Sequence, residues 1–204
     1  MIGVINLGNS NITSLTNSLD YLNIKYIIIE EANKLEQVDK IIFPGVGTFG
    51  NGIDRLKKLS LFEPIIKEVS ENKKPILGIC LGMQLLFESS DESKGVKGLS
   101  LLKGQVINLP KSINFSIPRI GWAESTLKFD FLSLKEKDKF DFYYIHSLYV
   151  KPNNTDIISI ETDIGITAAV KSGHIYGCQF HPEKSHIMGL NILKSFSEIT
   201  KGND

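Results

Sequence analysis

The first half of the chain alternates unbroken apolar runs with segments in which apolar residues recur at helical spacing. The apolar runs have the length and β-branched content of buried strands, and they cover 2–7, 24–29, 40–43 and 75–79. The helical spacing predicts helices over 15–22, 53–72 and 81–88. Strands without a polar face that alternate with helices predict a doubly wound α/β fold, in which helices cover both faces of a mostly parallel sheet.

After about residue 98, short β-like runs separated by turns replace this alternation. The runs cover 105–109, 142–149, 157–160, 166–171 and 175–180, and a closing helix is predicted over 189–199. They predict an antiparallel strand region added to the same core. Because the sequence contains no repeat, linker or low-complexity tract, we expect a single domain over 1–204.

Composition excludes several classes of protein. The 204 residues carry 23 Lys and Arg against 23 Asp and Glu, and the arginines are Arg55 and Arg119 alone, which argues against a nucleic-acid partner. No run approaches the roughly 20 apolar residues that span a bilayer, and no signal peptide is visible. Two cysteines, Cys80 and Cys178, make no disulfide framework. We therefore expect a cytoplasmic protein without a membrane partner.

The sharpest local signal is Gly78-Ile79-Cys80-Leu81-Gly82, at the junction of a predicted strand and a predicted helix. The serine version of this pattern is the nucleophile elbow, a tight turn that exposes the nucleophile at the carboxyl end of a strand. The helix N-terminus beyond it favours a thiolate, and the Leu81 N–H is placed to receive an oxyanion. The alternative is a small core residue in an ordinary strand-to-helix turn.

A thiolate nucleophile works with a base and with a group that orients the base. His181 follows a predicted strand, Glu183 comes two residues later, and Pro182 stiffens the loop between them. An imidazole held by the Glu183 carboxylate would accept the thiol proton and return it to a leaving amine. For this segment alone, the alternative is a surface histidine beside a turn glutamate.

The other histidines, the second cysteine and the glycine-rich turn carry weaker signals. His146 ends an aromatic strand and could line a pocket, His174 is expected to be exposed in a turn, and His186 flanks the closing helix. Cys178 is expected to be a buried, inert thiol. The 45–47 turn is too short for a phosphate loop and is compatible with a loop that carries an oxyanion donor. No Cys or His spacing resembles a zinc site.

Taken together, these motifs resemble the class I, or triad-type, glutamine amidotransferases, and most closely the glutaminase subunits of imidazole glycerol phosphate synthase. The resemblance runs nearly end to end and includes 8–11, 44–49, 75–84, 118–122, 144–147 and 179–185. The cysteine and His-Pro-Glu blocks are shared by the whole class, whereas the Pro-Gly-Val-Gly, Gly-Trp and His-Ser blocks point to the subunit. The resemblance implies a flavodoxin-like α/β fold.

It also implies a chemistry in which Cys80 attacks the side-chain amide carbon of glutamine, ammonia leaves, and the glutamyl thioester is hydrolysed to glutamate. His181 would be the acid and base, and Glu183 would orient it. The remaining roles implied are an oxyanion hole formed by Val46, Gly47 and Leu81, and glutamine binding by Gly47, Gln84 and His146. The resemblance implies no cofactor and no metal.

The implied partner is a (βα)8-barrel cyclase subunit in a heterodimer. It would receive the ammonia, shielded from water, and use it for imidazole glycerol phosphate synthesis in histidine biosynthesis. The family resemblance further implies that the glutaminase is nearly silent until the barrel binds its ribonucleotide precursor. The positions that match the docking face of the family are Asn11, Pro118, Ile120, Trp122 and Lys184.

Two departures from the family pattern lie at or near that face. Ser10 replaces the usual glycine and Ala123 the usual asparagine. They keep open a second acceptor for the ammonia, an amino- or amidino-sugar of a surface polysaccharide. Two alternatives from other classes are a non-catalytic docking subunit, which the intact Cys80, His181 and Glu183 disfavour, and a stand-alone thiol hydrolase, which the match to a docking face disfavours.

Overall fold

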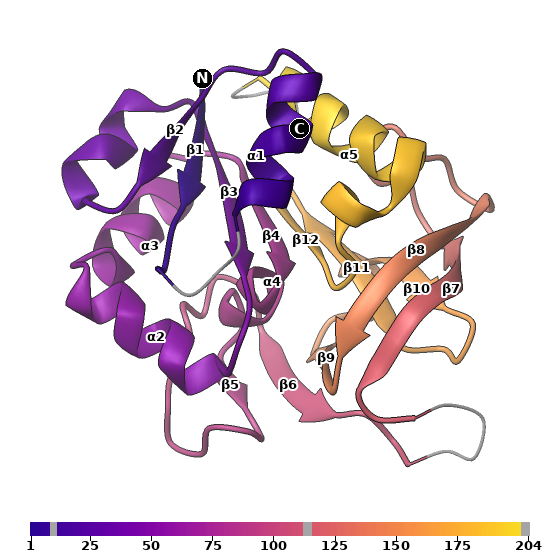
Figure 1. Ribbon diagram of the computed structural model, residues 1–204. Coiled ribbons are helices and arrows are strands. Elements are labelled where there is room, and N and C mark those ends of the chain that lie inside the picture. The colour runs from indigo at the N-terminus through magenta and orange to yellow at the C-terminus, as the bar shows by residue number, and fades with distance from the viewer. Residues whose placement is uncertain (9–11, 112–115, 201–204) are drawn as a thin grey trace.

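The computed structural model describes residues 1–8, 12–111 and 116–200. In the first half of the chain, strands alternate with helices (Figure 1). These elements are β1 (Ile2–Ile5), α1 (Thr13–Tyr21), β2 (Tyr26–Ile29), the 3-10 helix η1 (Ala32–Gln37), β3 (Lys40–Gly45), α2 (Phe49–Lys58), α3 (Phe62–Ser70), β4 (Ile76–Cys80) and α4 (Leu81–Leu85).

The second half is built mainly of strands and closes with one helix. Its elements are β5 (Ser89–Ser90), β6 (Gly104–Asn108), β7 (Arg119–Leu127), β8 (Lys139–His146), β9 (Leu148–Pro152), η2 (Thr155–Ile157), β10 (Ile158–Thr162), β11 (Thr167–Ser172), β12 (Ile175–Cys178), η3 (Pro182–Lys184) and α5 (His186–Glu198).

Within the described residues, one nine-stranded sheet organises the molecule, in the order β2-β1-β3-β4-β12-β11-β10-β7-β8. The strands from β2 to β12 pair in parallel, and those from β11 to β8 continue the sheet in antiparallel pairs. A small sheet, β5-β6-β9, packs beside it. The predicted doubly wound α/β fold with an added antiparallel region is confirmed.

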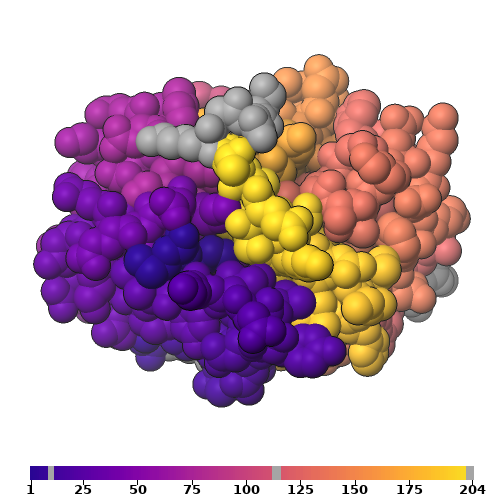
Figure 2. Space-filling view, turned by 90° about the horizontal axis from the view of Figure 1, so that it is seen from above, coloured from indigo at the N-terminus to yellow at the C-terminus, as the bar shows by residue number. Residues whose placement is uncertain are grey.

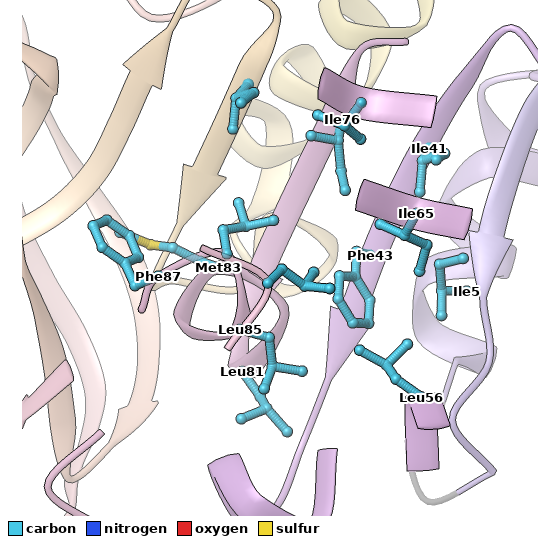
Figure 3. Packing of buried hydrophobic residues seen from close by; sticks show 14 of the residues in the cluster. Ile5, Ile41, Phe43, Leu56, Ile65, Ile76, Leu81, Met83, Leu85 and Phe87 are labelled. Carbon is cyan, nitrogen blue, oxygen red and sulfur yellow. The ribbon is translucent and has the colours of Figure 1, made fainter. Parts of the chain in front are cut away.

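Two apolar cores cover the two faces of the large sheet, which explains why the strands carry no polar face. Phe43 of β3 points into the core that α2 and α3 cover, as Figure 3 shows together with Ile41 and Leu56. The neighbouring Ile42 points the opposite way, into the core that α1 and α5 cover. Successive residues of a strand face opposite sides, so each central strand supplies both cores.

The last helix ties the end of the chain to the sheet. In the space-filling view, α5 lies between the N-terminal half and the antiparallel strands (Figure 2). It follows η3 almost directly and approaches it closely, because a Cβ at Gly189 would collide with the Pro182 carbonyl. The packing of α5 therefore also fixes the loop that carries His181. Of the helices in the described part of the chain, none is long and apolar enough to cross a membrane.

Three helix predictions need correction. The helix predicted over 53–72 is two helices, α2 and α3, separated at Ser60, whose φ of +55° cannot continue a helix. The helix predicted over 81–88 ends at Leu85, because the chain turns into the short strand β5. The closing helix begins at His186, earlier than predicted.

Two strand predictions also need correction. The run 142–149 is divided between β8, which belongs to the large sheet, and β9, which belongs to the small one, and the division falls at Ser147. Strand β7 was not predicted at all. It exposes Ile120 and Trp122 to solvent, so it lacks the hydrophobic pattern by which buried strands are recognised.

Candidate active site

The strand-to-helix turn predicted at 78–82 has the geometry of a nucleophile elbow. Cys80 ends β4 with φ +54° and ψ −111°, a conformation that costs a non-glycine residue of the order of 1–3 kcal/mol. Both flanking glycines are sterically required, because a Cβ at Gly82 would collide with the Phe43 carbonyl and one at Gly78 with the Met83 backbone. The Cys80 side chain is 8% exposed. The strain and the close packing hold the sulfur at the carboxyl end of β4.

The helix that follows the cysteine is shorter than the sequence indicated. α4 has five residues, so only about one turn of aligned peptide dipoles lies behind the sulfur. Leu81 is its first residue, and the first N–H groups of a helix have no partner inside the helix. The Leu81 N–H therefore has no partner within the helix, and the dipole contributes less to a thiolate than a long helix would.

His181 and Glu183 form the predicted pair. The imidazole Nδ1 lies 2.8 Å from Glu183 Oε1, and both side chains are largely buried. A clamp to β8 holds the loop: the His181 N–H donates to the Tyr143 carbonyl, the Ser185 hydroxyl donates to the His181 carbonyl, and the Tyr143 N–H donates to that hydroxyl. Sequence reasoning identified the pair and missed the clamp, because Tyr143 is distant in the chain.

Electrostatics favour a charged imidazole at this position. Burial opposes the imidazolium, but the interactions of His181 with the Cys80 sulfur and with the Glu183 carboxylate outweigh burial and raise the pKa of His181 to about 10. Because Nδ1 faces Glu183, Nε2 remains for the sulfur. The arrangement suits a thiolate–imidazolium pair.

A cavity of about 240 Å³ opens in front of Cys80. The predicted site residues that line it are Val46, Gly47, Cys80, Leu81, Gln84, His146, His181 and Lys184. Glu183 does not line it and lies behind His181. Gly47 has φ +101°, in the left-handed region where a side chain is strained. The cavity is smaller than the roughly 300–1,000 Å³ of sites for drug-sized ligands, so it suits a molecule the size of an amino acid.

His146 presents a hydrogen-bond acceptor at this cavity. Its Nδ1 lies 2.8 Å from the Leu148 carbonyl, which accepts only, so Nδ1 carries the proton. Burial, with Arg119 and His181 adding to its effect, lowers the pKa of His146 to about 4 and keeps the ring neutral. Its Nε2 is buried and has no hydrogen-bond partner within the described parts of the chain. An N–H group of a ligand would satisfy it.

The remaining histidines and Cys178 take no part in the cavity. His174 lies in the expected turn, but it is half-buried with its ring Nε2 2.8 Å from the Val69 carbonyl, so the expectation that it is exposed is wrong. His186 stacks against the Trp122 ring at 4.7 Å between centroids. Cys178 is fully buried, and burial raises the pKa of its thiol, as expected of an inert cysteine.

Two residues at the site were not predicted. Glu92 lines the cavity and accepts a hydrogen bond from the Phe49 N–H at the start of α2, 2.8 Å away. Gln179 is fully buried and donates from Nε2 to the Cys80 sulfur at 3.4 Å. Glu92 lies in a loop without a motif. Gln179 stands two residues before His181, which is the signal that could have identified it.

Four of the five expected docking-face residues lie in the described part of the chain, and Asn11 lies outside it. Pro118 directly precedes β7, and Ile120 and Trp122 lie on this strand, 61% and 47% exposed. Trp122 packs edge-on against Tyr143, and the Lys184 ammonium lies 5.8 Å above the same Tyr143 ring. These contacts bring Trp122 and Lys184 to one exposed face beside the cavity.

An elbow cysteine, a buried His–Glu pair and an adjacent acceptor-lined cavity at the carboxyl ends of parallel strands are the parts of a thiol-based acyl-transfer enzyme. Comparison with known proteins specifies this class. The class I glutamine amidotransferase family matches residues 3–198.

Known relatives are similar over nearly the whole chain. Imidazole glycerol phosphate synthase subunit HisH of Caldanaerobacter subterraneus is 41% identical, with 98% of this chain and 99% of the relative covered. The subunit of the same name from Listeria monocytogenes serotype 4a is 38% identical, with 98% and 96% covered.

Solved structures share the fold at low sequence identity. A crystal structure of a glutamine amidotransferase is 16% identical, with a TM-score of 0.77 and 96% of each chain covered. A glutamine amidotransferase from Thermotoga maritima is 17% identical, with a TM-score of 0.63 over 89% of this chain and 75% of the other.

The chain therefore belongs to the class I glutamine amidotransferases and, within that class, to the HisH subunits of imidazole glycerol phosphate synthase. The family resemblance recognised in the sequence is confirmed, and so is the class of enzyme that it implied.

Proposed function

We propose that this chain is the glutaminase subunit of an imidazole glycerol phosphate synthase, that it hydrolyses glutamine through Cys80, and that it passes the ammonia to a (βα)8-barrel cyclase subunit. One observation carries the proposal. The strained Cys80 elbow shares a cavity with His181, and the Nδ1 of His181 lies 2.8 Å from Glu183 Oε1. The full-length similarity to HisH subunits favours the histidine pathway over a sugar acceptor.

In the first half of the reaction, the Cys80 thiolate attacks the side-chain carbonyl carbon of glutamine. A C–S bond forms, and the carbonyl electrons move to oxygen, where the Leu81 N–H and the Val46–Gly47 backbone are placed to receive the charge. The His181 imidazolium gives its proton to the amide nitrogen, the C–N bond breaks, and ammonia leaves.

In the second half, neutral His181 accepts a proton from water as the water oxygen attacks the thioester carbon. The C–S bond breaks, glutamate leaves, and the thiolate–imidazolium pair is restored. Glu183 holds Nδ1–H throughout and stabilises the charged ring. The net reaction consumes glutamine and water and yields glutamate and ammonia.

Glutamine binding draws on Gly47 and His146. Gly47 leaves open space where a Cβ would stand, so the substrate can approach the backbone there. The buried acceptor Nε2 of His146 suits an N–H of the substrate. Gln84 lines the same cavity, with its amide N–H groups donated to the Leu148 carbonyl and to Gln179.

The docking of the barrel is assigned to the face formed by Pro118, Ile120, Trp122 and Lys184. Exposed aromatic and aliphatic side chains on one strand are typical of interface anchors. Lys184 both belongs to this face and lines the cavity, so the ammonia would leave next to the bound partner.

Glutamate release by the purified chain tests the proposal, measured alone and with a histidine-pathway barrel subunit and its ribonucleotide. We expect strong activation when both are added, and Cys80→Ala to abolish synthesis from glutamine but not from free ammonia. The matched control is Cys178→Ala, which removes the other, fully buried thiol and should preserve both activities.

Loss of the ammonia-dependent synthesis in Cys80→Ala would refute the assigned role of the cysteine. A chain that is not activated, yet is alkylated at Cys80 by a glutamine-like electrophile, would be a glutaminase that serves another acceptor.

A further inference from the structure

The sulfur of Cys80 receives less help from its helix than the motif alone suggests, because α4 spans only Leu81–Leu85. The Ile145 carbonyl lies 3.8 Å from the sulfur. That carbonyl accepts a hydrogen bond from a neutral thiol but opposes a thiolate, since its oxygen carries a partial negative charge. The His181 imidazolium offsets part of this effect, and a second, uncharged donor aimed at the sulfur would add to it.

Gln179 is such a donor. Its side chain is 0% exposed, and its Nε2 lies 3.4 Å from the Cys80 sulfur. A primary amide can present either N–H or C=O to a neighbour. Whether Gln179 favours or opposes the thiolate therefore depends on what fixes the orientation of its amide.

Gln84 fixes that orientation. Its Nε2 donates to the Leu148 carbonyl at 3.4 Å and to Gln179 Oε1 at 3.0 Å. Because a backbone carbonyl only accepts, it determines which end of the Gln84 amide faces it. The N–H groups of Gln84 then face the oxygen of Gln179, which turns the nitrogen of Gln179 toward Cys80. A flip of the Gln84 amide would place its oxygen against two other oxygens, and a flip of the Gln179 amide alone would place two NH2 groups together in a buried site.

We infer that Gln179 holds the Cys80 sulfur by an N–H···S hydrogen bond that favours its thiolate form, and that Gln84 is a positioning residue that acts through Gln179. The inference rests on the proposed role of Cys80 as the nucleophile. It assigns Gln84, expected from the sequence to bind glutamine, a task that precedes substrate binding.

The experiment measures the rate at which iodoacetamide alkylates Cys80 as a function of pH, in the full chain without glutamine or partner. Mass spectrometry of peptides separates Cys80 from Cys178. The variants are Gln179→Met and Gln84→Met, which keep side-chain length and remove the amide. The matched control is Gln105→Met, the same change at an exposed glutamine on β6.

Loss of a hydrogen bond to a charged group should move the pH midpoint of alkylation upward by about one pH unit in Gln179→Met. Gln84→Met should move it in the same direction by a smaller amount, and Gln105→Met should leave it unchanged. In the double variant the shift should equal that of Gln179→Met alone, because Gln84 acts through Gln179.

An unchanged midpoint in Gln179→Met, with circular dichroism and melting like those of the wild type, would overturn the inference. Additive shifts in the double variant would overturn the relay through Gln84. If Gln179→Met does not fold, an unchanged midpoint of alkylation in a folded Gln84→Met would overturn the inference instead. Since alkylation needs neither glutamine nor partner, these outcomes are independent of whether glutamate release supports the proposed function.

Discussion

The neutral state of His146 leads to a quantitative prediction about acid stability. The ring is 5% exposed, and its pKa in the folded chain is about 4 against an ordinary value of 6.5. This difference corresponds to about 3 kcal/mol of folding free energy. Because the pKa of His146 is lower in the folded chain than in the unfolded chain, this contribution to the free energy of unfolding is complete above about pH 6.5 and is lost as the pH falls toward 4.

The perturbation that isolates this effect is His146→Asn. The asparagine Nδ2 can take the place of the imidazole Nδ1 as donor to the Leu148 carbonyl, but it does not titrate. Urea unfolding between pH 7 and pH 4 gives the free energy of unfolding of both proteins. We expect the wild type to lose about 3 kcal/mol more than the variant over this interval. Carboxylates titrate in both proteins, so their effect cancels in the difference.

The control is Tyr144→Phe, next to His146 on the same side of the sheet. It removes the 2.7 Å hydrogen bond between the tyrosine hydroxyl and Ser125. Burial raises the pKa of Tyr144, so its hydroxyl stays neutral throughout the interval, and the substitution should lower stability by the same amount at every pH. Parallel curves for the wild type and His146→Asn would refute the reasoning.

Two further predictions concern the proposed catalytic pair, His181 and Glu183, and the proposed docking face. Glu183→Gln keeps an acceptor for the His181 Nδ1–H but removes the charge that stabilises the imidazolium. The kcat for glutamate release should therefore fall about 10- to 100-fold. An unchanged kcat would contradict the role assigned to Glu183. Lys184→Ala removes an exposed side chain that lies over the Tyr143 ring, so stability should fall by less than about 1 kcal/mol while activation by the barrel subunit drops severalfold. Melting temperature and the activation ratio, measured on the same protein, test the second prediction; a large fall in melting temperature with intact activation would count against it.

Local features account for what could be predicted from the sequence. The apolar runs at 40–43 and 75–79 indicated strands buried on both faces, and β3 and β4 are such strands. The glycines around Cys80 indicated a tight turn. In that turn Cys80 has a φ of +54°, and the backbone packs so closely that a Cβ at Gly78 or Gly82 would collide with it. Such signals survive in a single sequence because the residues that cause them are neighbours in the chain.

The remaining errors have a common cause. The division of 142–149 between two sheets depends on which strand each half meets, and β7 has no buried-strand pattern because its outer face stays exposed. Helix ends at Ser60 and Leu85 were missed because apolar spacing continues across both breaks.

The sequence by itself determined the class of fold, the tight turn at Cys80 and the His181–Glu183 pair, because strand and helix periodicity, the elbow turn and the His-Pro-Glu loop are all encoded within a few residues. Only the tertiary structure decided which hydrogen bonds surround these residues. It placed the Leu148 carbonyl against both His146 and Gln84, turned Gln179 toward the sulfur, and clamped the His181 loop to Tyr143. Apart from the one between His146 and Leu148, those contacts join residues far apart in the chain, and their hydrogen-bond directions follow from packing that no local pattern records.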